Sequence, residues 1–412
     1  MRVLLFTGKG GVGKTTTAAA TAVALARSGR KVLVLSTDPA HSLGDAFDVT
    51  LGGEPAEVDG TSLPGLYAAH VDTRALVDEA WEPLRAQLRT LLSGAGVEDI
   101  VADELTVLPG VEDLLALEQV RRATQDGPWE VVVVDCGPTA ETLRLLSLPE
   151  ALGGYLERLF PAHRRAVRGV LAGLAGSGAT VARWDAAAAS LSRLAEQLSG
   201  LRAMLADRST TTVRLVLTPE RVVAAETRRT ITALALHELH VDGLVANRLV
   251  PDPGTGRSAA VQWLRVRRRE QEDVLAELAE LTTGAGVPVR TVAHRAGEPV
   301  GLDDLAELAV DLYGDDDPLD GGSARPLMEL RRTAGEGTSV DSEYALDLQV
   351  PGIGDGEVDL VRIGDDLAVT VGGRRRTVAL PPVLRRCEVT GADLDDDVLS
   401  VAFRPDPSVW MR

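Results

Sequence analysis

The residues of this chain whose types and spacing are best suited to chemistry form a glycine-rich segment near its start, residues 8–15. The segment consists of Gly8, Lys9, Gly10, Gly11, Val12, Gly13, Lys14 and Thr15. Its spacing matches G-x-x-x-x-G-K-[ST] between an expected strand and an expected helix. Glycines let backbone N–H groups approach phosphate oxygens, and the start of a helix favours negative charge. The segment therefore predicts a phosphate-binding loop.

The polar side chains of this loop predict ATP and magnesium as its ligands. Lys14 is expected to reach the β- and γ-phosphates and the Thr15 hydroxyl to bind Mg²⁺, with Thr16 also at the nucleotide. Only three of the 43 basic residues are lysines, and two of them, Lys9 and Lys14, lie here. A chain that otherwise uses arginine needs a compact ammonium group at this place. An incidental glycine turn is the alternative reading, and it does not account for the two lysines.

Two carboxylates follow or end apolar runs elsewhere in the chain. Asp38 comes shortly after the run Lys31–Ser36, and Asp135 ends the run Trp129–Asp135. The carboxyl ends of parallel strands form the ligand-binding edge of an open α/β sheet. Asp38 by itself also fits a turn former. Together with the glycine-rich loop, the two positions predict acidic groups at the nucleotide edge.

The elements that position these residues alternate between strand and helix from Arg2 to about Gly314. Continuous apolar strands without alternation are typical of a parallel sheet that helices cover on both faces. The expected strands include Val3–Thr7, Lys31–Ser36, Trp129–Asp135, Val213–Leu217, Val241–Asn247 and Pro288–Val292. Residues 1–314 are therefore predicted to form a doubly wound α/β domain with a mostly parallel sheet, of the P-loop NTPase kind.

Two stretches, about 76–124 and 150–206, interrupt this pattern with helix only. In the second, leucines recur at spacings of three and four residues, as along a packed helical seam. They are Leu191, Leu194, Leu198, Leu201 and Leu205. The seam fits a helical hairpin packed on its neighbours, and a surface for an apolar protein client is the second reading.

After residue 314 the composition and the periodicity both change. Residues 315–342 are rich in Gly, Asp and Ser and are predicted to be a linker. Residues 343–405 show short alternating runs separated by turn signals, which predict a small antiparallel β-sandwich. The alternating residues include Tyr344, Leu346, Leu348, Val350, Leu367, Val369, Val371, Leu399, Val401 and Phe403. Residues 406–412 form a tail.

The lysine after the first glycine of the loop makes the sequence similar to the deviant Walker A class of NTPases. Residues 36–47 (STDPAHSLGDAF) and 131–149 (VVVVDCGPTAETLRLLSLP) resemble the switch I and switch II regions of the arsenite-pump and tail-anchored-protein-targeting ATPase family. The resemblance implies that Lys9 reaches the nucleotide of a partner subunit, that Asp38 and Asp135 belong to the magnesium shell, and that Asp45 polarises the attacking water.

The same resemblance implies that Pro138 and Thr139 sense the γ-phosphate. Glu141 stands where the family commonly has histidine. Asn247, at the end of an expected strand, matches the asparagine that contacts the adenine edge, for which an amide suits because it both donates and accepts; a strand cap is the alternative. Residues 344–403 resemble the α-crystallin-like domain appended to some bacterial members.

The composition restricts the partners. With 61 acidic and 43 basic side chains the net charge is −18, which leaves no electrostatic footprint for nucleic acid or an anionic bilayer. No apolar stretch predicts a membrane anchor. The two cysteines, Cys136 and Cys387, are far apart in the sequence, so we expect no disulfide scaffold, no zinc site and a cytoplasmic location.

The sequence as a whole predicts an Mg²⁺-dependent ATPase. Lys9 implies a homodimer whose shape changes with nucleotide state, with an apolar protein client as the expected partner. An arsenite-like efflux role is the first alternative, although it calls for thiolate ligands. A spatial organiser of the cell-division or partition type is the second, and it calls for a membrane helix or a basic DNA-binding face.

Overall fold

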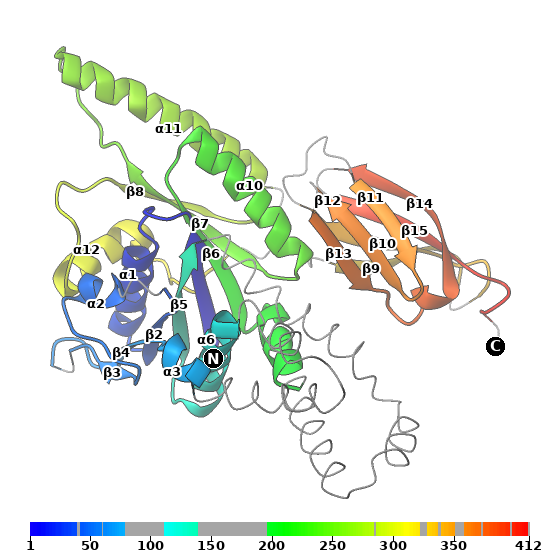
Figure 1. Ribbon diagram of the computed structural model, residues 1–412. Coiled ribbons are helices and arrows are strands. Elements are labelled where there is room, and N and C mark those ends of the chain that lie inside the picture. Colours follow the sequence, from blue (N-terminus) through cyan, green and yellow to red (C-terminus); the bar gives the residue numbers. More distant parts are fainter. Residues whose placement is uncertain are drawn as a thin grey trace, which may run out of the picture. The chain divides into compact units, whose positions relative to one another are not determined.

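A computed structural model of the chain describes residues 1–38, 42–59, 61–78, 111–138, 196–283, 286–321, 328–336, 339–350, 358–371, 374–395 and 398–410 (Figure 1). It divides into two compact units, residues 1–4 with 25–211 and residues 5–24 with 212–412. The predictions made for Leu191, Leu194, Thr139 and Glu141 fall outside the described residues.

The nucleotide-binding part contains an eight-stranded sheet in the order β3-β4-β2-β5-β1-β6-β7-β8. The strands are β1 (Arg2–Gly8), β2 (Val32–Ser36), β3 (Ala56–Glu57), β4 (Leu66–His70), β5 (Val131–Pro138), β6 (Thr211–Leu217), β7 (Val241–Leu249) and β8 (Val289–Ala293). β2 pairs in parallel with β4 and β5, and β7 pairs in parallel with β6 and β8. The short β3 pairs with β4 in the antiparallel direction. The predicted doubly wound, mostly parallel α/β fold is confirmed.

The central strands are buried along their whole apolar length. Val3–Phe6 of β1 and Val132–Val134 of β5 have no exposed surface. A strand whose successive side chains point to opposite faces can be apolar throughout only if both faces are covered. Each fully buried Val, Leu or Phe contributes about 1.5–3 kcal/mol, so these runs commit the chain to a central position in a sheet.

The helices around the sheet are α1 (Lys14–Arg27), α2 (Ser42–Phe47), α10 (Arg221–Leu236), α11 (Ala259–Thr283) and α12 (Leu302–Tyr313). The buried side of α12 is formed by Leu305, Leu308, Ala309 and Leu312, the three-and-four spacing of one helix face. Figure 1 shows α10 and α11 running beside each other, with α11 the longer. α12 therefore buries one face and leaves the other to solvent, whereas α1 has no exposed residue before Arg27.

The first helical insertion contributes α3 (Thr73–Leu76) and α6 (Val111–Asp126), which contact each other. Of the second insertion, residues 196–206 are described and helical. Leu198, Leu201 and Leu205 are each at most 3% exposed. This part of the leucine seam is packed inside the protein, in agreement with the reading as a packed helix.

The C-terminal part consists of two antiparallel sheets, β14-β15-β10-β9 and β11-β12-β13. Their strands are β9 (Met328–Ala334), β10 (Glu343–Gln349), β11 (Val358–Ile363), β12 (Asp366–Val371), β13 (Arg374–Ala379), β14 (Cys387–Asp395) and β15 (Val398–Pro405). Their common core includes Leu346, Val369, Val401 and Phe403. The predicted antiparallel β-sandwich is therefore confirmed, and those alternating apolar residues whose side chains are described form its interior.

The stretch 315–342 contains more structure than its composition indicates. β9 lies within it and pairs with β10, with Leu330 opposite Leu346. At its start, the Pro318 carbonyl accepts a hydrogen bond from Arg214, and Asp316 forms an ion pair with Arg290. Composition does not reveal these contacts because each depends on a partner distant in the sequence.

Candidate functional site

The glycine-rich loop joins β1 to α1, as the motif requires. β1 ends at Gly8 and α1 begins at Lys14. Gly11 and Gly13 have φ values of 77° and 92°, which side chains other than glycine rarely adopt. A Cβ on Gly10 or Gly11 would meet no heavy atom within 4 Å, so the backbone is open to a ligand there.

The other two glycines of the loop are required by packing. A Cβ on Gly8 would lie 2.0 Å from the Val216 carbonyl oxygen, and one on Gly13 would lie 2.4 Å from Asn247 Nδ2. Both neighbours belong to adjacent elements of the same unit, the ends of β6 and β7. The loop therefore packs closely against β6 and β7 at Gly8 and Gly13, and its backbone is open at Gly10 and Gly11. A phosphate could approach the backbone N–H groups at these two open positions.

Lys14 is curled back over this loop. Its side chain is 7% exposed, and Nζ donates to the Lys9 carbonyl oxygen at 3.5 Å. Thr15 and Thr16 are half-buried in the first turn of α1, and the Thr17 hydroxyl donates to the Gly13 carbonyl at 2.8 Å. The ammonium group of Lys14 therefore already lies at the loop backbone that is expected to surround the phosphates.

Asn247 at the end of β7 fixes the loop from the side. Its Nδ2 donates to the Val12 carbonyl oxygen at 2.9 Å, and its Oδ1 accepts from the Arg248 N–H at 2.8 Å. The sequence predicts that Asn247 contacts adenine, which stays a prediction. The contact with Val12 is an additional role that the sequence analysis missed, because a hydrogen bond between residues 235 positions apart leaves no local signal.

Gln271 on α11 supports the turn that follows Asn247. Its Oε1 accepts from the Val250 N–H at 2.8 Å, and its Nε2 donates to the Arg248 carbonyl at 3.2 Å. Arg248 has a φ of 59°, an uncommon conformation for a residue with a side chain. Two part-buried hydrogen bonds therefore hold a strained turn beside the P-loop.

Lys9 projects from the loop toward solvent. Its side chain is 50% exposed, and its Nζ lies 3.9 Å from Glu226 Oε2 on α10, itself 39% exposed. Such an exposed and long ion pair contributes at most about 1 kcal/mol. Lys9 is therefore available to another anion at little cost.

The acidic residues lie in the first unit. Asp135 is fully buried in β5, in register with Ser36 of β2, whose Oγ donates to Asp135 Oδ2 at 3.3 Å. Asp38 is half-buried two residues beyond β2. Asp45 is exposed in the first turn of α2. Asp38 thus follows β2 as expected, whereas Asp135 lies three residues before the end of β5 and not at its end as the apolar run predicted, because the strand continues to Pro138. Asp45, expected at the attacking water, faces solvent.

Several predicted switch residues are described only in part. Pro138 ends β5, but its side chain and all of Thr139 are outside the described residues, as are residues 39–41 of the first switch region. The γ-phosphate-sensing role of Pro138 and Thr139 stays a prediction.

The available donors suit magnesium. Within the ranges that the structure describes, no three His, Cys, Asp or Glu side chains gather into a metal site. Mg²⁺ is commonly held by one or two carboxylates together with substrate phosphates and waters. Thr15, Asp38 and Asp135 offer only oxygen ligands, and the open backbone at Gly10 and Gly11 leaves room for the phosphates. The donor chemistry of these residues therefore suits magnesium, and their joint role at Mg·ATP stays a prediction.

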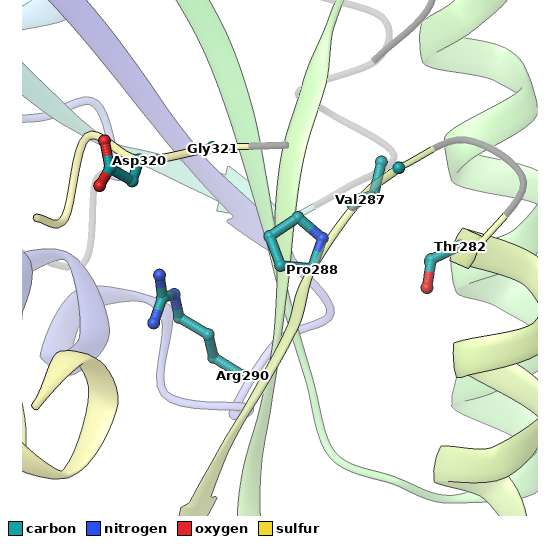
Figure 2. A pocket seen from close by; sticks show the side chains of 7 residues that line it. Thr282, Val287, Pro288, Arg290, Asp320 and Gly321 are labelled. Atoms are coloured by element: carbon teal, nitrogen blue, oxygen red, sulfur yellow. The ribbon is translucent and has the colours of Figure 1, made fainter. Parts of the chain in front are cut away.

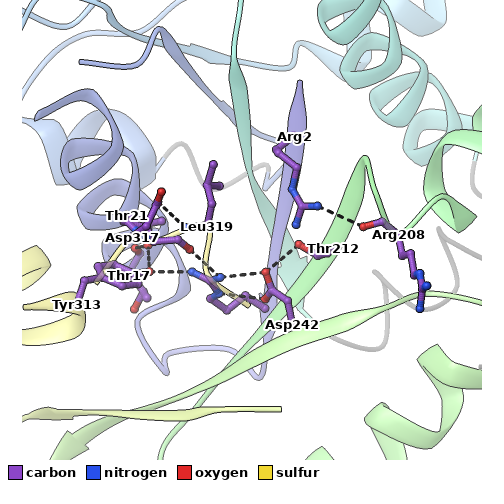
Figure 3. Close-up of polar contacts among 11 residues, drawn as sticks. Arg2, Thr17, Thr21, Arg208, Thr212, Asp242, Tyr313, Asp317 and Leu319 are labelled. Carbon is purple, nitrogen blue, oxygen red and sulfur yellow. Dashed lines mark hydrogen bonds and ion pairs between the residues drawn. The ribbon is translucent and has the colours of Figure 1, made fainter. Parts of the chain in front are cut away.

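A buried polar network supports α1 from below the loop (Figure 3). Tyr313 Oη lies 2.6 Å from Thr21 Oγ1 and accepts from Arg214 Nη1 at 3.0 Å. Arg214 also pairs with Asp242, and both side chains are 2% exposed. Burial disfavours the charged form of Arg214, yet the Asp242 carboxylate raises the pKa of the guanidinium above its ordinary value. The helix that begins with Lys14 is therefore tied to a permanent buried ion pair.

A shallow pocket of about 370 Å³ lies beside the start of β8 in the second unit, away from the end of β7 where Asn247 lies (Figure 2). It is lined by Thr282, Gly286, Val287, Pro288, Arg290, Asp320 and Gly321. Pro288 precedes β8, whereas Asn247 and the loop lie where β7 ends. None of the lining residues is one that the sequence assigns to the nucleotide, and Arg290 is already paired with Asp316.

Comparison with known proteins agrees with this geometry. Residues 1–314 match the family described as anion-transporting ATPase of the ArsA type, and residues 341–403 match the HSP20-like domain found in ArsA. The chain is 39% identical to protein Rv2184c of Mycobacterium tuberculosis, covering 99% of this chain and 97% of the relative.

Two further relatives carry names that state an activity. A putative arsenical pump-driving ATPase of Prosthecochloris vibrioformis is 33% identical, with 98% of this chain and 96% of the relative covered. The ATPase GET3 of Podospora anserina is 30% identical over 68% of this chain and 82% of its own length.

A mostly parallel sheet with this loop after its first strand defines a P-loop nucleoside-triphosphate-binding protein. The chain belongs, more narrowly, to the ArsA-type ATPase family, with the HSP20-like domain at its C-terminal end. The resemblance drawn from the loop, the switch regions and the C-terminal alternation is thereby confirmed. In the described residues, no helix combines the length and the apolar character that crossing a membrane requires.

Proposed function

We propose that this protein is an Mg²⁺-dependent ATPase that hydrolyses ATP to ADP and phosphate. The observation that carries the proposal is the loop itself, with Lys14 folded over it and the backbone open at Gly10 and Gly11. In this proposal the backbone N–H groups and Lys14 hold the phosphate oxygens and neutralise their charge. Membership of an ATPase family supports the same activity.

The hydrolysis step requires one water and no covalent intermediate on the protein. The water oxygen forms a bond to the γ-phosphorus as the bond from phosphorus to the ADP oxygen breaks. Asp45 orients that water and accepts its proton, a role for which an exposed carboxyl group is suited. Thr15, Asp38 and Asp135 would hold magnesium, which would neutralise charge on the phosphates when bound. Pro138 and Thr139 are proposed to sense the γ-phosphate, and Asn247 to contact adenine.

We further propose that the protein acts as a homodimer in which Lys9 binds the nucleotide of the partner subunit. The exposure of Lys9 and the weakness of its pair with Glu226 support this role. Nucleotide state would then change the dimer between an open and a closed form.

An apolar protein client is the proposed partner of this switch. The HSP20-like match at residues 341–403 supports a chaperone-like role. The described leucines of the second insertion do not provide the surface, because Leu198, Leu201 and Leu205 are buried. We propose no nucleic acid, membrane anchor or zinc as a partner, and a cytoplasmic location stays a prediction from the composition.

An anion-efflux role is the second candidate, favoured by relatives named as putative arsenical pump-driving ATPases. A soft metalloid would bind to thiolates. Cys136 is buried in β5 of the first unit, and Cys387 is buried in β14 of the second. The two thiols therefore offer no thiolate pair within one unit, and client binding is the better-supported role.

The proposal is tested with Lys14→Ala and Asp45→Asn. Lys14→Ala should abolish ATP binding, because it removes the ammonium group at the phosphates. Asp45→Asn should bind ATP nearly as the wild type does and hydrolyse it about 10² times more slowly, the scale of a lost catalytic base. Binding is measured with a fluorescent ATP analogue and turnover by phosphate release. Wild-type turnover by Asp45→Asn would remove Asp45 from the mechanism.

A further inference from the structure

Ser36 lies on the middle one of three neighbouring strands, β4, β2 and β5. It is the last residue of β2, in register with His70 of β4 on one side and Asp135 of β5 on the other. Its side chain is 1% exposed. The hydroxyl is therefore buried beside the carboxylate that the proposed function assigns to magnesium.

The Ser36 hydroxyl contacts both residues of the proposed magnesium shell in this unit. Asp38 N–H donates to Ser36 Oγ at 3.3 Å, and Ser36 Oγ donates to Asp135 Oδ2 at 3.3 Å. A serine hydroxyl has one hydrogen to donate and two lone pairs to accept with. The same hydroxyl can therefore accept from the Asp38 N–H and donate its hydrogen to the Asp135 carboxylate.

The backbone around this hydroxyl is fixed by separate contacts. Thr37 N–H donates to the Asp135 carbonyl oxygen at 2.9 Å, and the Val71 N–H donates to the Ser36 carbonyl oxygen at 2.9 Å. These bonds hold β2 against β5 and β4 whether or not Ser36 has a hydroxyl. The hydroxyl adds an orientation of the Asp135 side chain, which the backbone contacts do not provide.

We propose that Ser36 is a positioning residue for the magnesium site. It turns the Asp135 carboxylate and anchors the backbone of Asp38, so that both acids are preorganised before the metal binds. This inference rests on the proposed function, because it takes these two acids as magnesium ligands or neighbours of its water shell. Residues that orient metal ligands in this way typically change metal affinity by about 10–100-fold when removed.

The chain supplies a matched control at another strand pair. Thr212 on β6 is 2% exposed, and its Oγ1 donates to Asp242 Oδ2 on the neighbouring β7 at 2.8 Å. Like Ser36, it is a buried strand hydroxyl that orients a buried carboxylate on the next parallel strand. Asp242, however, has Arg214 as its partner and no assigned role at the nucleotide. Thr212→Ala therefore measures the cost of losing such a bond to the fold alone.

The test compares Ser36→Ala with Thr212→Ala in the full chain. A fluorescent ADP analogue is bound first in EDTA and then titrated with Mg²⁺, and Mn²⁺ binding to the complex is followed by electron paramagnetic resonance. Ser36→Ala should bind nucleotide without metal as the wild type does, but require roughly tenfold more Mg²⁺ or Mn²⁺. Thr212→Ala should leave the metal titration unchanged while lowering the unfolding temperature.

Two conservative variants complete the test. Ser36→Thr keeps the hydroxyl and should restore the wild-type metal titration. Ser36→Cys approximately keeps the side-chain volume but offers only a weak hydrogen-bond donor, so it should behave as Ser36→Ala does. If Ser36→Ala does not fold, Ser36→Cys takes its place in the test. If the wild type responds to metal but Ser36→Ala and Ser36→Cys give the same metal titration as the wild type, the role of Ser36 is wrong and the proposed function stands. A wild-type protein whose nucleotide binding and turnover do not respond to Mg²⁺ would instead overturn the proposed function.

Discussion

Asn247 Nδ2 donates a hydrogen bond to the Val12 carbonyl oxygen at 2.9 Å, which joins the end of β7 to the phosphate-binding loop. The same side chain stands where a Cβ on Gly13 would lie, 2.4 Å from Nδ2. The conformation of the loop therefore depends on Asn247, which lies outside the motif, as well as on the glycines of the motif.

This relationship predicts how Asn247→Ala should behave. If Asn247 acts through the loop, the affinities for ATP, GTP and inorganic tripolyphosphate should fall together, by roughly tenfold, the value of one lost hydrogen bond at a closed site. Competition with a fluorescent nucleotide measures all three. A selective loss of ATP affinity, with tripolyphosphate unchanged, would show that contact with adenine is the dominant role.

Lys9 should act in trans. Lys9→Ala and Asp45→Asn subunits are each expected to be inactive, but mixed dimers contain one site with its own Asp45 and the partner's Lys9. Partial ATPase activity should therefore return on mixing. Glu226→Gln is the control, because loss of an exposed pair at 3.9 Å should leave activity and stability nearly unchanged. No recovered activity in mixed dimers of demonstrated composition would count against a shared site.

The buried pair Arg214–Asp242 should be costly to break from one side. Arg214→Met leaves the Asp242 carboxylate buried without its cation and should reduce the free energy of unfolding by about 3–5 kcal/mol. Asp311→Asn removes one partner of Arg295 in a pair of 25% and 47% exposed side chains, and should cost at most about 1 kcal/mol. Urea unfolding of both variants checks the difference. Equal losses would mean that burial does not determine the cost.

The C-terminal domain should be separable from the ATPase part only if β9 is removed together with β10, its pairing partner. Deleting residues 322–412 keeps the contacts of Asp316 and Pro318 with Arg290 and Arg214, and should leave a folded ATPase. Deleting residues 343–412 leaves β9 without β10, and an unpaired strand promotes aggregation. Solubility and turnover distinguish the two truncations. Loss of both in the 322–412 deletion would show that the β-domain completes the ATPase fold.

The ion pair between Arg331 of β9 and Asp347 of β10 should make the C-terminal domain sensitive to acid. The Arg331 guanidinium lowers the pKa of Asp347 below its ordinary 3.8, with Ser400 also donating to the carboxylate. Because the folded-state pKa is the lower one, the pair stabilises the fold above pH 3.8 and that contribution is lost as pH falls below it. Arg331→Met should flatten this acid dependence, as measured by thermal unfolding between pH 3 and 7 relative to wild type; an unchanged dependence would contradict the assignment.

The sequence by itself determined the features that depend on neighbouring residues. The spacing of Gly8, Gly13 and Lys14 predicts the loop between strand and helix, because all residues of the motif lie within one short contiguous segment. Unbroken apolar runs such as Val131–Val134 predict a buried parallel sheet, since no other environment covers both faces. The alternation from Tyr344 to Phe403 predicts the sandwich for the same reason, as a pattern of period two leaves one face for a core.

Only the tertiary structure decided the contacts between residues far apart in the sequence. Ser36 meets Asp135 at a separation of 99 residues, and Thr21 meets Tyr313 at a separation of 292. A hydrogen bond is short and directional, so whether such groups meet depends on strand register and helix placement, which local patterns do not specify. For the same reason β9 was hidden in a stretch of linker composition: its order comes from pairing with β10.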